Sequence, residues 1–159
     1  MKVLVESFSN QLREALEIGT HAKLTSSKKK ISNILISGLG GSGIGGTILA
    51  ELVALEATIP ITVSKGYFIP KFVNENTLVI ISSYSGNTEE TLQAMGLAIK
   101  RNAKIVCVTS GGKVADLAKK KKLDVISIPG GNPPRACLGY SLTQLFVILS
   151  FHKIIGNKY

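Results

Sequence analysis

The chain has 159 residues, of which 45% are hydrophobic and 18% charged, and its formal net charge is +9. This length suits one globular domain. No apolar run reaches the roughly 18–20 residues of a membrane-spanning helix, and the N-terminal stretch lacks the long apolar core of a secretory signal, so we expect a cytoplasmic protein without membrane contact.

Apolar residues recur along the chain with helical and strand spacing in alternation. The predicted elements are, in chain order, an amphipathic helix at 3–21, a strand at 31–37, a helix at 42–55, strands at 61–63 and 77–82, a helix at 87–101, a strand at 104–109, a helix at 113–120, a strand at 124–128 and a helix at 136–154. Asn87 is the expected N-cap of its helix, and Glu90 stands three residues on, which is a capping-box arrangement.

The predicted strands are nearly continuous runs of Val, Ile and Leu, which is typical of a parallel sheet buried on both faces. We therefore expect an α/β fold, a doubly wound three-layer α/β/α domain with a five-stranded parallel sheet in the flavodoxin-like order 2-1-3-4-5. This order places the first and third strands side by side across the topological switch point. Ligands of such sheets bind there, outside the carboxyl ends of the strands.

The turn after the first strand is rich in glycine, with the sequence GLGGSGIGG at 38–46. It satisfies the dinucleotide pattern G-x-G-x-x-G, but no acidic residue stands near the end of the second strand to hold a ribose. The P-loop pattern fails because Gly46 stands where a lysine is required. What remains is a set of free N–H groups at a helix N-terminus, beside the hydroxyl of Ser42. The alternative is that the glycines only allow close packing of helix on strand.

The turn after the third strand is more specific, because it carries three hydroxyls within six residues: Ser83, Ser85 and Thr88. Gly86 permits a sharp bend, and Asn87 begins a helix. Hydroxyls and helix N-terminal amides together can bind a phosphate without a lysine. The alternative is an ordinary helix cap, but a cap needs only one such residue.

A third segment follows the last strand and has the sequence PGGNPPRA at 129–136. Arg135 stands at the start of a predicted helix, where the helix dipole disfavours positive charge. An anionic ligand at the same sheet edge would explain this placement. The alternative is a surface arginine in an ordinary salt bridge.

The excess positive charge is concentrated in two lysine runs, 28–30 and 119–122, each just before a predicted strand. Lysines at helix C-termini complement the helix dipole and keep the surface solvated. Arginine is scarce, and no aromatic residues are interleaved with the lysines to stack on bases. We therefore expect a solvated surface and no nucleic-acid partner.

The two cysteines, Cys107 and Cys137, are too few for a disulfide scaffold and lack the spacing of metal ligands. We expect both to be reduced thiols packed as small hydrophobic side chains. The sequence predicts no metal site.

The three segments together resemble the sugar isomerase (SIS) domain, and specifically the N-terminal half of the bifunctional phosphoglucose/phosphomannose isomerase family. The resemblance implies an isomerase that interconverts glucose 6-phosphate or mannose 6-phosphate with fructose 6-phosphate, with no metal or nicotinamide cofactor. The family's phosphate-binding role falls on Ser42, Ser83, Ser85 and Thr88, with the backbone of Gly41. Arg135 would lie beside the reacting carbons and stabilise the enediolate intermediate. The family more often has a glutamine and one proline where this chain has residues 132–134.

The family has two SIS domains, and its catalytic glutamate and ring-opening histidine belong to the second. We expect one SIS domain over residues 1–159, with residues 1–30 packing on it as a helix and a basic loop, and no second SIS domain. Isomerisation needs a base, yet the two histidines, His21 and His152, lie on predicted helices away from the carboxyl edge. Neither Glu89 nor Glu90 is assigned as the base.

These observations predict a chain that binds sugar phosphate and turns over little or none alone. The last predicted helix is apolar around most of its circumference, so we expect a homodimer or association with a second SIS domain to cover it. One alternative is a non-catalytic SIS module that senses sugar phosphates. The other, a dinucleotide-dependent enzyme, is disfavoured by the missing ribose carboxylate.

Overall fold

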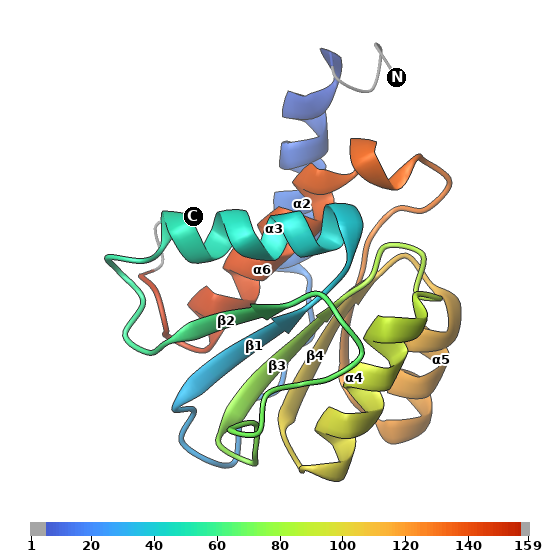
Figure 1. Cartoon of the computed structure of the whole chain (residues 1–159). Helices are drawn as coiled ribbons and strands as arrows, with labels where there is room; N and C mark the ends of the chain where they lie inside the picture. Colours follow the sequence, from blue (N-terminus) through green and yellow to red (C-terminus); the bar gives the residue numbers. More distant parts are fainter. Residues whose placement is uncertain (1–5, 157–159) are drawn as a thin grey trace.

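A computed structural model describes residues 6–156, in which helices and strands alternate along the chain except that the second and third strands follow each other without a helix between them (Figure 1). The elements are, in chain order, α2 (Phe8–Thr20), β1 (Asn33–Ser37), α3 (Gly40–Leu52), β2 (Ile61–Ser64), β3 (Thr77–Ser82), α4 (Glu89–Lys100), β4 (Lys104–Thr109), α5 (Gly112–Lys121), β5 (Asp124–Ser127), the 3₁₀ helix η1 (Pro134–Ala136) and α6 (Leu138–Phe151). The part of the predicted first helix at residues 3–5 lies outside the described residues.

Within residues 6–156, the strands form one five-stranded parallel sheet in the order β2-β1-β3-β4-β5. Helices α3 and α6 cover one face, and α4 and α5 cover the other (Figure 1). The predicted three-layer fold and strand order are therefore confirmed. All six residues of β3 are buried, because this strand lies in the centre of the sheet and is covered on both faces.

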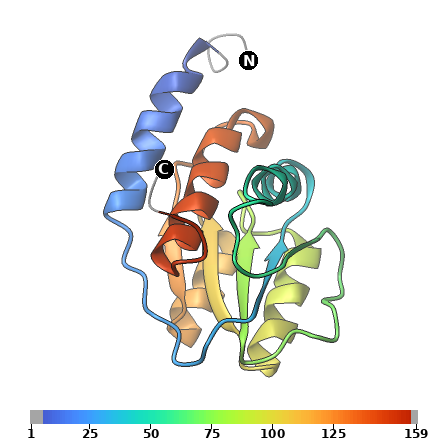
Figure 2. The ribbon, with the colours of Figure 1, turned by 90° about the vertical axis from the view of Figure 1, so that its left-hand side faces the viewer.

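Helix α6 lies in the interior of its layer, between the sheet, α3 and α2 (Figure 2). The buried side chain of Gln144 donates from Nε2 to the carbonyl of Ala15 on α2 at 2.7 Å. Gly19 lets the two helices approach, since a Cβ there would lie 2.6 Å from Val147 Cγ2. The apolar circumference of α6 is thus covered within the chain, and the expectation that it leaves a face for another protein is wrong.

Helix α2 also holds the segment that enters α6. Gln11 donates from Nε2 to the carbonyl of Ala136 in η1 at 2.7 Å, and Tyr140 donates its hydroxyl proton to Glu14. Burial and the Glu14 carboxylate raise the pKa of Tyr140 to about 12. The N-terminal helix therefore fixes the backbone on both sides of the start of α6.

The beginning of α4 differs from the prediction. Its N-cap is Thr88, without a side-chain cap bond, so the capping box of Asn87 and Glu90 is wrong. The Asn87 side chain instead accepts a bond from the N–H of Lys113 at 3.1 Å, in the first turn of α5. This amide thus joins two neighbouring loops at the carboxyl edge of the sheet.

None of the helices described within 6–156 is long and apolar enough to cross a membrane.

Candidate functional site

A cavity of about 500 Å³ lies at the carboxyl ends of β1 and β3. Its walls are the two predicted turns and the segment before α6, which the fold brings together from three distant parts of the chain. The residues that line it are Leu39, Gly40, Gly41, Ser42, Tyr84, Ser85, Thr88, Pro133, Pro134 and Arg135. In Figure 1, the strands point toward this edge of the sheet. Five of the six residues predicted from the sequence lie around this one cavity.

The hydroxyls of Ser42, Ser85 and Thr88 share a hydrogen-bonding pattern. Ser42 Oγ accepts a bond from the N–H of Tyr84 at 3.3 Å, and Ser85 Oγ accepts one from the N–H of Asn87 at 3.3 Å. Thr88 Oγ1 accepts a bond from a serine hydroxyl at 3.3 Å. A hydroxyl that already accepts from the protein keeps its own proton for another acceptor. All three lining hydroxyls can therefore donate into the cavity.

The serine that donates to Thr88 is Ser83. It is only 2% exposed and is not among the residues that line the cavity. The structure thus places this predicted site residue behind the cavity wall, where its hydroxyl orients Thr88. The number of hydroxyls in this turn could not show which of them line the cavity and which, like Ser83, only hold a lining residue in place.

The glycines of the first turn divide into two groups. A Cβ on Gly38 would lie 2.8 Å from the carbonyl oxygen of Ser82, and one on Gly46 would lie 2.9 Å from Ile36 Cγ2. A Cβ on Gly43 would lie 2.6 Å from the carbonyl oxygen of Gly38. These three glycines allow the close packing of helix on strand that the sequence left open as an alternative.

Gly40 and Gly41 instead face the cavity. Gly40 has φ +56°, and a Cβ there would meet nothing within 4 Å. Together with Ser42 they form the first turn of α3, whose N–H groups have no acceptor inside the helix. The N-terminus of α3 therefore offers backbone donors and a partial positive charge to the same cavity as the three hydroxyls.

Arg135 lies in η1, where its side chain is exposed and lines the cavity. The salt bridge that the sequence left open as an alternative is absent: within 6–156 no carboxylate pairs with this guanidinium. The cavity thus combines one free cation with hydroxyl and amide donors. Such a donor set favours an anion that accepts several hydrogen bonds.

Tyr84 is the site residue to which the sequence assigned no role. Its hydroxyl accepts a bond from the N–H of Asn132 at 3.1 Å, and its carbonyl accepts the Ser110 hydroxyl at 2.7 Å. Burial and a hydrogen bond with Cys137 raise the pKa of the Tyr84 phenol. This residue connects the second turn to the segment that carries Arg135. The feature of the sequence that could have pointed to Tyr84 is an aromatic residue between two serines at the end of a strand.

Replacing Tyr84 by phenylalanine is expected to loosen the segment that carries Arg135. The amide of Asn132 would lose its acceptor, at a cost of about 1 kcal/mol in the free energy of unfolding. Hydrogen exchange measured by NMR should show lost protection at Asn132. The control is Tyr67→Phe, since the exposed Tyr67 hydroxyl contacts Glu89 outside the cavity. Unchanged exchange at Asn132 in the Tyr84 variant would contradict this role.

No Asp, Glu or His among the described residues lines the cavity. Glu89 accepts a bond from the Tyr67 hydroxyl at 3.3 Å, and Glu90 is half-buried elsewhere. His21 lies at the end of α2, and His152 follows the end of α6 at the opposite edge of the sheet. Over the same residues, no three His, Cys, Asp or Glu side chains are grouped to hold a metal ion. The described lining of the cavity thus supplies hydroxyl and amide donors and one guanidinium.

Comparisons with known proteins bear on this donor set. A family model described as SIS domain matches residues 27–148. A bifunctional phosphoglucose/phosphomannose isomerase from Caldicellulosiruptor bescii is 44% identical over 157 residues, covering 97% of this chain and 46% of the relative. A D-glucosamine-6-phosphate 4-epimerase from Sulfolobus acidocaldarius is 35% identical over 132 residues, covering 82% of this chain and 41% of the relative.

Solved structures show the same fold. A chain from Clostridium difficile 630, provisionally described as a phosphosugar isomerase, superposes with a TM-score of 0.71 at 22% identity. The match covers 98% of this chain and 47% of that one. The chain thus spans about half the length of the curated relatives it matches.

Proposed function

The chain belongs to the SIS domain family, and on this basis we propose that its cavity binds the phosphate of a phosphosugar. The whole activity that we propose is the interconversion of glucose 6-phosphate or mannose 6-phosphate with fructose 6-phosphate. The name of the Caldicellulosiruptor relative, at 44% identity, supports this choice of reaction.

The observation that carries the proposal is the hydrogen bonding of the three lining hydroxyls. Ser42, Ser85 and Thr88 each accept a bond from the protein, which leaves each hydroxyl proton free to be donated to a ligand. A phosphate dianion only accepts hydrogen bonds, so it matches a wall of donors. The backbone N–H of Gly41 and the N-terminus of α3 add to the same wall. Ser83 takes part by orienting Thr88.

The proposed role of Arg135 follows from charge. Isomerisation passes through an enediolate, whose negative charge forms on oxygen as a base moves a proton between C2 and C1. An unpaired guanidinium at the cavity rim can stabilise that charge. The base itself is not among the described lining residues. We infer that it comes from a polypeptide that completes the site, and that this chain alone binds substrate with little turnover.

The epimerase relative supports the assignment of phosphate binding to this chain and of the catalytic base to another polypeptide. It matches largely the same part of the chain as the isomerases, yet its name states a different reaction on a phosphosugar. The shared half would then supply phosphate binding, while the other half decides the chemistry. Within residues 6–156 no carboxylate or imidazole lines the cavity, and this observation also favours the second candidate function, a non-catalytic module that senses sugar phosphates.

Calorimetric titration tests the proposal. Fructose 6-phosphate should bind this cavity with a stoichiometry of one and inorganic phosphate should bind it more weakly, whereas NAD should not compete with fructose 6-phosphate for it. A coupled assay should detect little or no isomerisation by this chain alone. Binding of NAD without binding of sugar phosphate would overturn the proposal, and rapid turnover would show that the base lies within this chain. We place the protein in the cytoplasm, where phosphosugars occur and where its two buried free thiols stay reduced.

We also propose that the chain self-associates through α3. A stripe of apolar side chains runs along this helix, with Ile44 45% exposed and Leu52 64% exposed, and continues to Leu55, which is fully exposed. Ile48 lies between them on the same face and is half-buried. Two copies related by a two-fold axis can cover their stripes with each other.

Replacing Leu52 by glutamine is expected to weaken this dimer by about tenfold or more, because the variant places an amide in the apolar interface. Sedimentation equilibrium measures the dissociation constant. The control is Leu16→Gln, which changes a similarly exposed leucine on α2 and should leave the dimer intact. A wild-type chain that stays monomeric at high concentration would contradict the proposal.

A further inference from the structure

A second cavity, of about 510 Å³, lies at the opposite edge of the sheet, where the strands begin. It is formed by the linker before β1, the connection between α3 and β2, and the residues after α6. The residues that line it are Ser26, Ser27, Lys29, Lys30, Ile31, Thr58, Ile59, Phe151, His152, Lys153 and Ile154. It shares no residue with the phosphosugar cavity at the carboxyl edge.

The polar part of this wall is positively charged. It includes Lys29, Lys30 and Lys153, together with the hydroxyls of two serines and a threonine, and it contains no carboxylate. A lysine after α6 alone would be explained by the helix dipole. The other two lysines come from the linker, so that explanation does not cover them. All three lysines are exposed, and an anion bound between their ammonium groups would offset the repulsion among them.

The linker that presents these lysines is held in place at both ends. Before the lysines, the N–H of Thr25 donates to Asp124 Oδ2 at 2.9 Å. After them, Asn76 donates from Nδ2 to the carbonyl of Lys30 at 2.8 Å and accepts the N–H of Ser32 at 2.8 Å. Figure 2 shows this linker passing along the edge where the strands begin. The cationic wall is therefore anchored to the sheet.

The remaining part of the wall is apolar, with one unsatisfied polar atom. The Phe151 ring is 42% exposed and packs edge-on against His152, at a centroid distance of 5.1 Å. The buried Nε2 of His152 has no hydrogen-bond partner among the residues described. Burial and Lys104 lower the pKa of this imidazole, while Asp124 acts in the opposite direction. A ligand for this wall needs an aromatic or apolar body as well as negative charge.

We propose that this cavity binds a phosphate ester with an aromatic group, of the nucleotide class. The phosphate lies among Lys29, Lys30 and Lys153 and accepts bonds from the hydroxyls. The aromatic group packs on Phe151 and on the isoleucines of the wall. This site is separate from the phosphosugar cavity, so the proposal does not depend on the proposed isomerase function.

The test is a calorimetric titration with AMP, with inorganic phosphate and adenosine titrated in parallel. The protein is the chain with Ser85→Ala and Thr88→Ala, which removes hydroxyls from the phosphosugar cavity and so suppresses binding of AMP there. One AMP should bind, at least tenfold more tightly than either fragment. No binding of AMP, or equal affinity for inorganic phosphate, would overturn the proposal.

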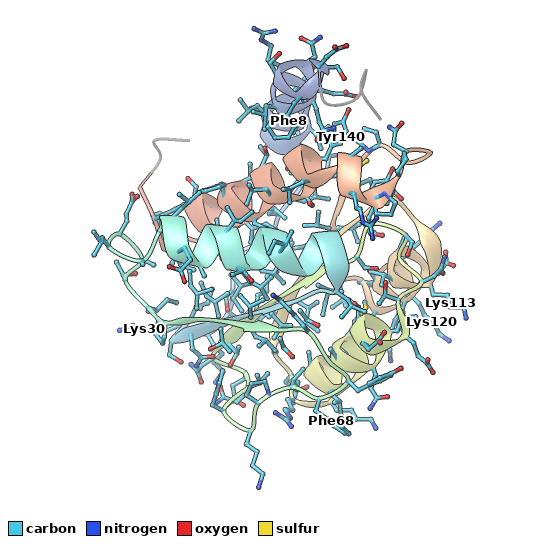
Figure 3. The ribbon with its side chains drawn as sticks, turned by 45° about the horizontal axis from the view of Figure 1, so that its top comes forward. Phe8, Lys30, Phe68, Lys113, Lys120 and Tyr140 are labelled. Atoms are coloured by element: carbon cyan, nitrogen blue, oxygen red, sulfur yellow. The ribbon has the colours of Figure 1, made fainter. Side chains whose placement is uncertain are left out.

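Lysine variants locate the site. Lys30→Gln with Lys153→Gln should weaken AMP binding by about 100-fold, about tenfold for each lost charged contact. The matched control is Lys119→Gln with Lys120→Gln, which removes the same charge from exposed positions at the end of α5. Lys30 and Lys120 are labelled on opposite sides of the molecule in Figure 3. Equal loss in both double variants would show that AMP responds only to net charge, and would overturn the proposed site.

Discussion

Replacing Ser85 and Thr88 together by alanine is expected to weaken binding of fructose 6-phosphate by about 30-fold or more. Each hydroxyl donates to the phosphate in the proposed complex, and a hydrogen bond to a charged group contributes about 1–3 kcal/mol. Two such bonds amount to about 2–6 kcal/mol, and every 1.4 kcal/mol is a tenfold change in affinity. The effect should be specific to binding, because Ser85 is exposed and Thr88 only half-buried.

Calorimetric titration of the variant with fructose 6-phosphate measures the loss, and circular dichroism checks that the fold is kept. The matched control is Ser9→Ala with Thr20→Ala, which removes two exposed hydroxyls from α2 at a distance from the cavity. Ser83→Ala should have an intermediate effect, since that hydroxyl reaches the ligand only through Thr88. Unchanged affinity in the Ser85 and Thr88 variant would remove the second turn from the site.

The sheet was predictable because its signal is local. Each strand is a short run of β-branched and aliphatic residues, and the helical spacing between them requires parallel connections. The position of the cavity followed from the strand order, since the turns after β1 and β3 meet wherever these strands are neighbours. Arg135 was predicted for a different reason, namely that a cation at the start of a predicted helix conflicts with the helix dipole. In the structure Arg135 lies in η1, before α6 begins at Leu138, so that conflict does not arise in the form expected, and the role of Arg135 stays a prediction.

The errors concern residues whose partners are remote in the sequence. Asn87 fits a local capping box, yet its amide bonds to Lys113, 26 residues away, and so joins two loops. The apolar circumference of α6 indicated an uncovered face, but α2 lies about 125 residues earlier in the chain and covers it. Tyr84 was overlooked because its hydroxyl contacts Asn132, 48 residues on. Periodicity and caps describe single elements, and these contacts exist only after the layers have packed.

Replacing Gly86 by alanine is expected to lower the free energy of unfolding by about 2–5 kcal/mol. The residue has φ +66°, a backbone conformation that costs an L-residue about 1–2 kcal/mol. A Cβ there would also overlap the carbonyl oxygen of Gly111 and lie 2.8 Å from Thr109 Oγ1, and overpacking of this kind costs about 1–3 kcal/mol. Urea denaturation measures the change. The loss is a large part of the roughly 5–15 kcal/mol that stabilises a domain.

The cost should extend from stability to binding, because the two loops are joined through their backbones at this point. The N–H of Val114 donates to the carbonyl of Gly86 at 2.9 Å, beside the bond between Asn87 and Lys113. Moving Gly111 aside to admit a methyl group would displace both bonds and with them the Ser85 and Thr88 hydroxyls. The control is Gly131→Ala, which has φ +83° but no atom within 4 Å of the new Cβ. It carries the backbone penalty alone, so the difference between the two variants measures the contact between the loops. Equal stability and equal affinity for fructose 6-phosphate in both variants would show that the contact neither stabilises the fold nor positions the site.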